Sequence, residues 1–317
     1  MVRDLAILNQ LGAGASAFIR AHVPGVRVVE IGTSPSPAEV DDVGATVLLA
    51  IPQHELTPAQ RASPVEWAAG IEWVHLPSAG ADPYPPALLQ GRVVTCARGL
   101  MSVPIAEHVL ATMLAFERGL PEIWAPGLVA ADVGPLGVLD GRTLGIVGLG
   151  SIGEAIATRA LAFGMDVVAA NRSGRSSSIA SVEVAPLDEV LARSDHLAVA
   201  IPLTAGTRHL FDDRTLSSVK PGMHLVNIAR GAVIDQDALV RALMDGRIAR
   251  ASLDVTEPEV LPADHPLRLH PHVRLSPHVS WSGPGVLQRG MARFLANLDR
   301  WVAGQPLVEL VNSAHGY

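Results

Sequence analysis

Short apolar runs alternate with helical patterns through the first third of the chain. Strand-like runs occupy residues 5–8, 26–31, 45–51 and 71–76. Helical patterns lie between them, at 14–22 and in the Pro-bounded segment 57–70. Because strands that alternate with helices pair in parallel, this pattern predicts a parallel α/β sheet.

The rest of the chain repeats this alternation after one long helix. We expect an amphipathic helix at 102–119, with Ile105, Val109 and Met113 near one side. Residues 120–140 contain three prolines and should be mostly loop. Strand-like runs then follow at 143–147, 165–170, 196–201, 224–228 and 251–255. A second wound parallel sheet is therefore predicted.

The strand at 143–147 leads directly into a glycine-rich turn. Gly148, Gly150 and Gly153 fit the spacing G-x-G-x-x-G, and strong helix formers follow from Ser151. In such a unit the first glycine permits a sharp turn, the second lets a pyrophosphate approach the backbone, and the third lets helix and strand pack closely. The N–H groups at the helix start then face the phosphates. This order predicts a dinucleotide site; a chance Gly-rich turn is the alternative.

Asn171 stands where such a unit places the residue that contacts the adenosine ribose. An acidic side chain there would repel a 2′-phosphate, whereas this chain has Asn171, Arg172, Ser173, Gly174 and Arg175. Guanidinium and short polar groups favour a phosphate through charge-assisted hydrogen bonds. We therefore expect NADP(H) to be preferred over NAD(H); a solvated loop without a role in cofactor choice is the alternative.

Composition narrows the class of protein. The 317 residues suit two domains, and a hydrophobic content of 49% supplies ample core. A net charge of −7 without a dense basic run argues against a nucleic-acid partner. The single cysteine, Cys96, cannot form an internal disulfide, and no apolar run approaches the roughly 18 residues of a membrane span. We expect a soluble cytoplasmic protein without membrane, nucleic-acid or metal partners.

Three side chains suited to chemistry follow strands in the second half. Arg230 comes after the strand at 224–228, Glu259 after the strand at 251–255, and His278 after a third short apolar run. Because parallel strands present their carboxyl ends at one edge, the three can converge. Arg230 can hold a carboxylate, His278 can deliver a proton to an adjacent carbonyl oxygen, and Glu259 can orient the imidazole. A surface ion pair for Arg230 and a structural role for one of twelve histidines are the alternatives.

Two further turns follow strands. Pro202 and Thr207 belong to a loop at a carboxyl end, where ligands of open sheets bind. Ser78, Ala79 and Gly80 form a turn of small residues whose backbone N–H groups can receive a small carboxylate, although an ordinary turn is the simpler interpretation.

Five stretches carry a family resemblance. They are Gly-Leu-Gly-Ser-Ile-Gly at 148–153, Pro-Leu-Thr at 202–204, Asn-Ile-Ala-Arg-Gly at 227–231, Leu-Asp-Val at 253–255 and Ser-Pro-His-Val at 276–279. On these, the chain resembles the D-isomer-specific 2-hydroxyacid dehydrogenase family, and within it the glyoxylate/hydroxypyruvate reductases. The resemblance implies an oxidoreductase that moves a hydride between NADP(H) and a small 2-ketoacid or D-2-hydroxyacid. In the reducing direction the histidine starts protonated, so activity should fall as pH rises.

The resemblance also implies roles for single residues. Arg230 binds the substrate carboxylate, His278 is the acid/base, and Asp254 lies near the nicotinamide. Glu259 pairs with the histidine, or Glu257 does if the loop register differs by two. The implied cofactor contacts are Gly148, Gly150, Ser151, Ile152, Gly153, Asn171, Arg172, Ser173, Pro202, Thr207, Ile228, Arg230, Asp254 and His278. The implied substrate contacts are Ser78, Ala79, Gly80, Met101, Arg230 and Trp281.

The family's domain plan is discontinuous. A flavodoxin-like substrate domain is expected at 1–99 and 283–317, with a Rossmann-type dinucleotide-binding domain inserted at 100–282. By the same resemblance, the helix at 102–119 is part of a homodimer contact.

Several functions remain open on the sequence. Formate- or phosphite-type dehydrogenases share the arginine and the histidine, although formate enzymes carry Gln where Glu259 stands. A phosphoglycerate dehydrogenase-like enzyme is a second alternative. A dinucleotide-sensing corepressor-like binding protein is the alternative from another class. Bulky apolar residues are candidates for the substrate pocket, namely Tyr84, Leu100, Met101 and Trp281. They favour glyoxylate, hydroxypyruvate, pyruvate or a larger apolar ketoacid over a phosphorylated one.

Overall fold

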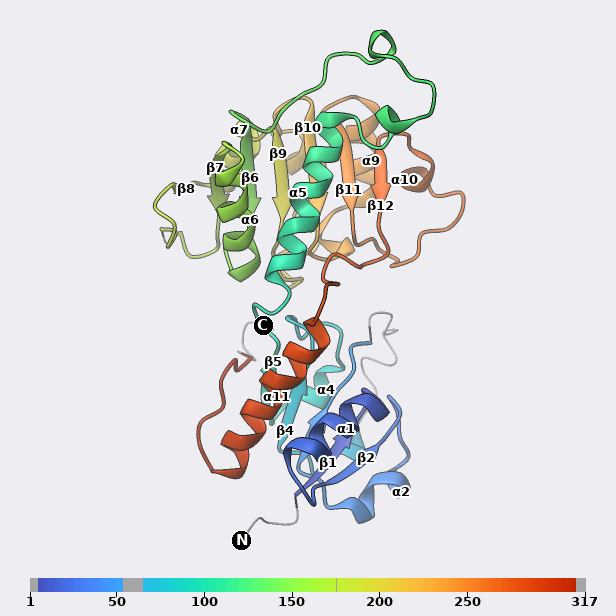
Figure 1. Ribbon diagram of the computed structural model, residues 1–317, viewed down its shortest axis with the longest axis vertical. Helices are drawn as coiled ribbons and strands as arrows, with labels where there is room; N and C mark the ends of the chain where they lie inside the picture. The colour runs from blue at the N-terminus through green and yellow to red at the C-terminus, as the bar shows by residue number, and fades with distance from the viewer. Residues whose placement is uncertain (1–4, 54–64, 175, 312–317) are drawn as a thin grey trace. The chain divides into compact units, whose positions relative to one another are not determined.

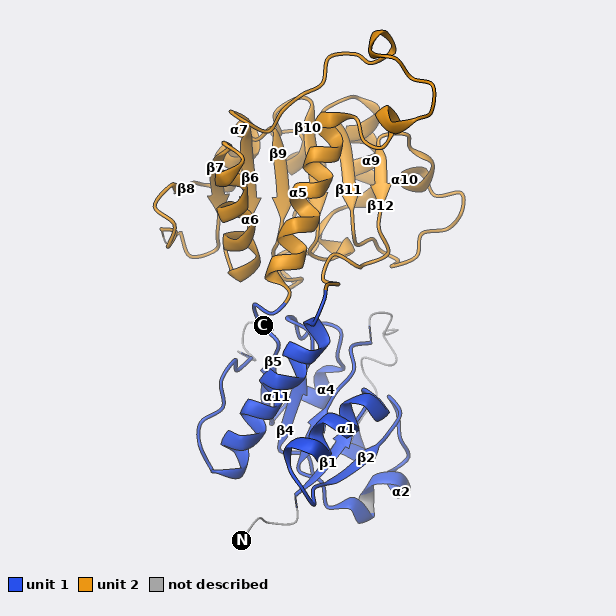
Figure 2. Cartoon of the chain, viewed as in Figure 1, with its two compact units in different colours: residues 1–100, 284–317 blue, residues 101–283 orange. Residues whose placement is uncertain are grey.

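The computed structural model describes residues 5–53, 65–174 and 176–311. The chain divides into two compact units (Figure 2). Unit 1 comprises Met1–Leu100 and Pro284–Tyr317, and unit 2 comprises Met101–Gly283. Both chain ends therefore belong to unit 1, and unit 2 is inserted between them. Each unit is built around one parallel sheet, so the predicted α/β fold class is confirmed.

The sheet of unit 1 has flavodoxin-like strand order. Its strands are β1 (Ala6–Asn9), β2 (Arg27–Glu30), β3 (Val47–Leu49), β4 (Trp73–Leu76) and β5 (Val93–Cys96). In space they follow the order β2-β1-β3-β4-β5. Because successive side chains on a strand point to opposite faces, Ile7 packs into one apolar layer and Leu8 into the other.

Two long helices, α1 (Ala13–His22) and α11 (Val286–Val302), pack on one face of this sheet (Figure 1). The indole of Trp73 stacks on Phe294 of α11 with ring centroids 5.4 Å apart. Shorter helices complete the unit: α2 (Pro37–Val40), α4 (Pro86–Leu89), and the 3₁₀ turns η1 (Asp41–Val43) and η2 (Glu66–Ala68). The C-terminal segment thus supplies α11, which together with α1 forms one of the two layers that bury the sheet of unit 1.

Unit 2 contains a doubly wound Rossmann-type sheet. Its strands are β6 (Thr143–Val147), β7 (Asp166–Ala170), β8 (Val182–Val184), β9 (His196–Val199), β10 (Met223–Asn227), β11 (Ile248–Leu253) and β12 (Val273–Leu275). The spatial order is β12-β11-β10-β9-β6-β7-β8. The order reverses between β6 and β9, and in such sheets ligands bind at the carboxyl ends of the strands beside this switch point.

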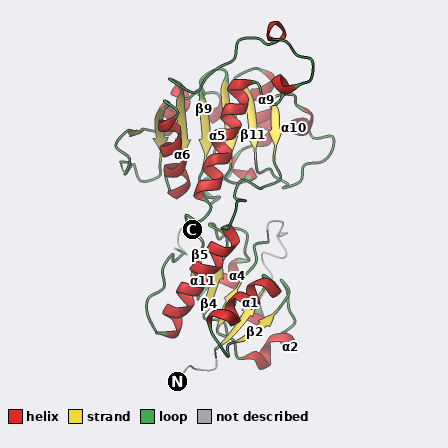
Figure 3. Ribbon diagram, in the orientation of Figure 1, coloured by secondary structure: helices red, strands yellow, loops and turns green. Residues whose placement is uncertain are grey.

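Helices cover both faces of this sheet (Figure 3). On one face α5 (Ser102–Arg118) packs against α6 (Ser151–Ala162). On the other lie α7 (Leu187–Arg193), α8 (Asp213–Leu216), α9 (Gln236–Met244) and α10 (Pro266–Leu269). Three 3₁₀ turns, η3 (Glu122–Trp124), η4 (Ala130–Asp132) and η5 (Gly231–Val233), lie in loops. The predicted helix at 102–119 and the loop that follows it are therefore present.

Some elements differ from the sequence prediction. Strands β5 and β8 and helix α11 are absent from the sequence prediction. Strands β5 and β8 have only four and three residues, which is too short for a clear alternation of apolar and polar positions. Of the helix expected at 57–70, residues 57–64 lie outside the described part, and the remainder forms only η2. None of the described helices is long and apolar enough to cross a membrane.

Candidate active site

The glycine-rich turn has the geometry that a dinucleotide needs. Gly148 has φ 106°, and a Cβ there would lie 2.4 Å from the carbonyl oxygen of Ala200. A Cβ on Gly153 would lie 2.2 Å from the carbonyl oxygen of Gly148, so α6 and β6 pack without room for a side chain. At Gly150, by contrast, a Cβ would meet nothing within 4 Å. The turn is therefore closed on its protein side and open at its middle glycine.

Helix α6 begins immediately after this opening. The N-cap residue is Gly150, which has no side chain to cap the helix, and the helix starts at Ser151. The first N–H groups of a helix have no intrahelical acceptor, and the helix dipole favours an anion there. Ile152 packs against the core below the turn. The backbone from 151 to 153 is thus open to a pyrophosphate, and the contact itself stays a prediction.

The segment after β7 contains the residues expected beside the adenosine ribose. The hydroxyl of Ser173 donates to Oδ1 of Asn171 at 3.1 Å, and the Arg172 side chain is exposed. Gly174 has φ 62°, which turns the chain back. The predicted contribution of Arg175 lies outside the described residues.

The loop after β9 is closed by threonine side chains. Oγ1 of Thr207 donates to the carbonyl oxygen of Pro202 at 2.7 Å and accepts from the backbone N–H of Thr204 at 2.8 Å. The Thr207 hydroxyl therefore shapes the loop itself. Ile228, another expected cofactor contact, is buried against the core.

The predicted histidine and glutamate lie in contact. Nδ1 of His278 is 2.5 Å from Oε1 of Glu259, with the two side chains 19% and 28% exposed. His278 follows β12 and Glu259 follows β11, so the pair lies at the carboxyl edge of the sheet. Glu257, the alternative partner, instead makes a bidentate pair with Arg208. The geometry therefore favours Glu259 over Glu257 as the partner of the imidazole.

A buried carboxylate shapes the loop that carries His278. Asp254 accepts hydrogen bonds from the hydroxyl of Ser276 and the backbone N–H groups of Val279 and Ser280 at 2.5, 3.0 and 3.0 Å. Burial alone would raise the pKa of Asp254, but these hydrogen bonds outweigh it and hold the pKa below its ordinary value. His278 itself has φ 52°, a left-handed conformation that non-glycine residues adopt only under local constraint. Asp254, expected near the nicotinamide, is thus the anchor of this loop.

Arg230 lies on a tightly fixed turn after β10. The side chain of Asn227 accepts from the N–H of Ala229 at 3.0 Å and donates to the carbonyl oxygen of Arg230 at 3.1 Å. Nη1 of Arg230 donates to the carbonyl oxygen of Ala229 at 2.7 Å. The asparagine of the Asn-Ile-Ala-Arg stretch therefore holds the arginine's backbone.

The expected substrate contacts are divided between the units. Ser78, Ala79 and Gly80 lie in unit 1, whereas Met101, Arg230 and Trp281 lie in unit 2. Oγ of Ser78 donates to the carbonyl oxygen of Gly80 at 2.7 Å and lies 3.1 Å from the hydroxyl of Tyr84. Tyr84 is 1% exposed, so it supports the turn and does not line an open pocket; burial raises its pKa. The indole N–H of Trp281 donates to the carbonyl oxygen of His278 at 2.8 Å.

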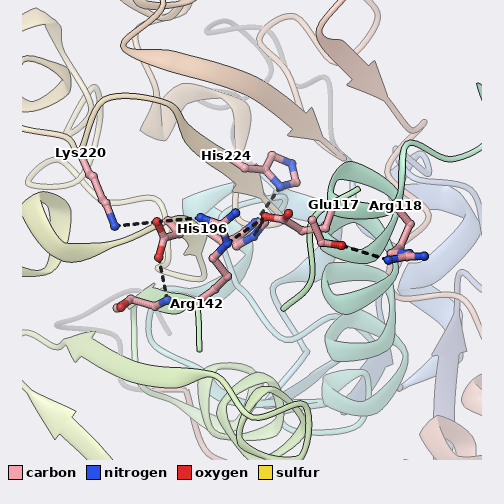
Figure 4. A network of polar contacts seen from close by, with 9 residues as sticks. Glu117, Arg118, Arg142, His196, Lys220 and His224 are labelled. Atoms are coloured by element: carbon pink, nitrogen blue, oxygen red, sulfur yellow. Dashed lines mark hydrogen bonds and ion pairs between the residues drawn. The ribbon is translucent and has the colours of Figure 1, made fainter. Parts of the chain in front are cut away.

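A second polar network, which sequence reasoning missed, lies at the amino ends of the strands of unit 2 (Figure 4). His196 at the start of β9 lies between Glu117 of α5 and His224 of β10, at 3.0 and 3.1 Å. His224 in turn lies 2.9 Å from the hydroxyl of Ser252. The available signal was a histidine near the start of each of two mostly apolar strands.

Together, the phosphate turn at a switch point, the arginine and the imidazole–carboxylate pair define a nicotinamide-dependent oxidoreductase of the doubly wound class. A model of the D-isomer specific 2-hydroxyacid dehydrogenase NAD binding domain matches residues 111–280. The chain belongs to this family, within its glyoxylate/hydroxypyruvate reductase-like members, and is an NAD(P)-dependent 2-ketoacid reductase.

Individual relatives agree with this assignment. A glyoxylate reductase of Thermofilum pendens is 35% identical over 72% of this chain and 70% of its own. A glyoxylate/hydroxypyruvate reductase B of Pectobacterium atrosepticum is 38% identical over 67% of this chain and 69% of its own. A D-isomer specific 2-hydroxyacid dehydrogenase from Xanthobacter autotrophicus Py2, solved with NADPH and MES, covers 99% of this chain and 100% of its own at 26% identity and TM-score 0.81.

Proposed function

We propose that this protein reduces a small 2-ketoacid of the glyoxylate or hydroxypyruvate type with NADPH. The observation that carries the proposal is the pairing of His278 with Glu259 at 2.5 Å, on the same sheet edge as the phosphate turn and Arg230. The glyoxylate and hydroxypyruvate reductases among the relatives support the substrate class. In this proposal unit 2 binds the dinucleotide and unit 1 is the substrate domain.

The proposed reaction assigns one task to each residue. The bound nicotinamide supplies the hydride for the ketone carbon. Arg230 binds the ketoacid carboxylate and polarises the adjacent carbonyl through charge-assisted hydrogen bonds. Because Nδ1 of His278 is engaged by Glu259, Nε2 is the atom that delivers a proton to the ketone oxygen. Glu259 fixes the ring orientation and stabilises the imidazolium.

Two further binding roles follow from the same proposal. The backbone of Ser78, Ala79 and Gly80 receives the ketoacid carboxylate, and Met101 and Trp281 contact the rest of the substrate. The preference for NADPH is supported by a segment in which Asn171, Arg172 and Ser173 stand where an acidic residue would select NAD. The relative solved with NADPH agrees with this choice.

We also propose that the enzyme is a homodimer with α5 in the contact. Val103 of α5 is 49% exposed, and Trp124 and Val129 in the segment after the helix are 71% and 61% exposed. Light scattering on the purified chain tests this proposal: a mass of one chain at micromolar concentration would contradict it.

The direct test is oxidation of NADPH and NADH, followed by absorbance, with glyoxylate, hydroxypyruvate, pyruvate, phenylpyruvate and 3-phosphohydroxypyruvate. We expect turnover of glyoxylate or hydroxypyruvate and a lower KM for NADPH than for NADH. Turnover confined to 3-phosphohydroxypyruvate would contradict the proposed substrate class. A lower KM for NADH than for NADPH would contradict the proposed cofactor preference.

A further inference from the structure

Arg208 and Glu257 join two loops at the carboxyl edge of the unit 2 sheet. Arg208 lies in the loop after β9, and Glu257 lies after β11, two residues before Glu259. Nη2 of Arg208 donates to Oε1 of Glu257 at 3.0 Å, and Nη1 donates to Oε2 at 3.1 Å. Two parallel N–H···O bonds fix the orientation of the carboxylate as well as its distance.

The backbone of Glu257 is held as well as its side chain. Gln236 is the first residue of α9; its Nε2 donates to the carbonyl oxygen of Glu257 at 2.5 Å, and its Oε1 accepts from the N–H of Glu257 at 3.1 Å. Glu257 is therefore fixed from the loop after β9 and from the start of α9. We call Arg208, Gln236 and Glu257 the clamp.

The clamped segment supports two groups that the proposed reaction needs. Oγ1 of Thr256 donates to the carbonyl oxygen of Glu259 at 3.0 Å, which closes the turn carrying that glutamate. On the other side, a Cβ on Gly231 would lie 2.0 Å from the carbonyl carbon of Thr256. The backbone next to Arg230 thus packs directly on the same segment. A shift of Glu257 would move the supports of Glu259 and Arg230 together.

The Arg208–Glu257 pair is a weak source of stability, because its side chains are 50% and 44% exposed and exposed ion pairs add little to the free energy of unfolding. We infer that the clamp is a positioning device, which holds Glu259 against His278 and keeps Arg230 in place during ketoacid reduction. This inference rests on the proposed function. Small displacements of groups that contact the substrate lower the rate strongly, so loss of the clamp should lower kcat.

The test is a charge-swap cycle with R208E, E257R and the double variant R208E/E257R. Each single variant places two like charges together and should lower kcat by about tenfold. The double variant restores an ion pair with reversed sense and should recover most of that loss. Melting temperatures should stay close to that of the wild type in all three. A double variant as slow as the singles, or singles with wild-type kcat, would overturn the inference.

The cycle also separates positioning from direct contact with the cofactor. If Arg208 bound NADPH itself, R208E would raise the KM for NADPH, E257R would not, and the double variant would not recover; this result would overturn the inference. A matched control is the bidentate Arg193–Glu183 pair, with distances of 2.8 and 2.7 Å. E183Q should leave kcat unchanged, whereas E257Q should lower it.

A measurement that does not depend on turnover tests the clamp separately from the proposed function. Amide hydrogen exchange of a peptide covering 254–262 should be faster in E257R and slower again in the double variant. Wild-type protein that turns over no ketoacid would contradict the proposed function. Exchange that is unchanged in E257R would contradict the clamp.

Discussion

Two hydrogen-bonded histidine–glutamate pairs lie at opposite edges of the sheet of unit 2. At the carboxyl edge, His278 and Glu259 lie 2.5 Å apart with side chains 19% and 28% exposed. At the amino edge, His196 and Glu117 lie 3.0 Å apart with side chains 0% and 6% exposed. The residue types are the same, but only the first of these two pairs is partly exposed to solvent.

The backbone supports the same distinction. His278 lies on a loop in a left-handed conformation that Asp254 holds in place, whereas His196 is part of a regular strand. His196 also contacts a second buried imidazole, His224, against which Phe116 stacks. Buried polar groups of this kind are costly unless every partner is present, so the amino-edge network is expected to govern stability and the carboxyl-edge pair to govern rate.

Replacement of His278 by Gln should have the largest effect on activity. Loss of a general acid lowers kcat by about 10²- to 10⁴-fold. The melting temperature should change little, because the side chain is partly exposed. Steady-state kinetics with the best ketoacid measures this effect, and His272→Gln, at an exposed position after α10, is the control. A His278→Gln enzyme within tenfold of the wild type would show that another group donates the proton.

Gly137→Ala should disturb the amino-edge network without removing any of its side chains. A Cβ on Gly137 would lie 1.6 Å from Oε2 of Glu117, so the carboxylate must move. We expect a loss of about 1–3 kcal/mol in the free energy of unfolding, measured by urea denaturation. Gly134→Ala is the matched control, because its Cβ would meet nothing within 4 Å. Equal stability of the two variants would mean that the network tolerates displacement of Glu117.

The stability of unit 2 should fall below about pH 6.5. Burial, followed by the charges of His196 and Arg250, holds the pKa of His224 well below its ordinary value of 6.5. The unfolded chain therefore binds a proton that the native state does not, and the free energy of unfolding falls as pH decreases, by up to about 1.4 kcal/mol per pH unit. His224→Gln should flatten the dependence of the unfolding midpoint on pH between 7 and 5. An unchanged slope would mean that His224 is already protonated in the native state.

Unit 1 provides an internal reference for this measurement. Burial, followed by the charge of Arg293, lowers the pKa of His75 to about 3, so its contribution to the pH slope has the same sign. The His224→Gln variant should keep this contribution, because His75 lies in unit 1.

Arg172→Gln should have the smallest effect, one limited to the choice of cofactor. Loss of one guanidinium beside a 2′-phosphate should raise the KM for NADPH by about tenfold and leave the KM for NADH nearly unchanged. Arg193→Gln, which removes an arginine that pairs with Glu183, is the control. Equal changes in both constants would mean that Arg172 does not contact the phosphate.

Local patterns in the sequence predicted the His278–Glu259 contact at the carboxyl edge. Strand, glycine turn and helix follow one another without interruption, and Arg230 and His278 each come directly after a strand. Because parallel strands end at one edge, chain order alone places these residues at the same edge of the sheet. The predicted fold class rests on the same alternation of strands and helices.

The amino-edge network and the clamp depend on partners distant in the chain. Glu117 and His196 are 79 positions apart, and Arg208 and Glu257 are 49 apart. Nothing in either local sequence indicates the other partner; only the packing of α5 on the sheet and of one loop on another brings them together. Helix α11, by contrast, could have been predicted from its local sequence. Its apolar residues repeat with helical spacing, at Met291, Phe294, Leu295 and Leu298.

The most direct test of the contrast between the two edges is a crossed measurement on Glu259→Gln and Glu117→Gln. For each variant, kcat of ketoacid reduction and the free energy of unfolding are determined on the same preparation. We predict that Glu259→Gln lowers kcat by at least about tenfold with little change in stability. Glu117→Gln should lose about 1–3 kcal/mol of stability and keep kcat within about threefold of the wild type. The opposite assignment, with kcat lost in Glu117→Gln and stability lost in Glu259→Gln, would contradict this account.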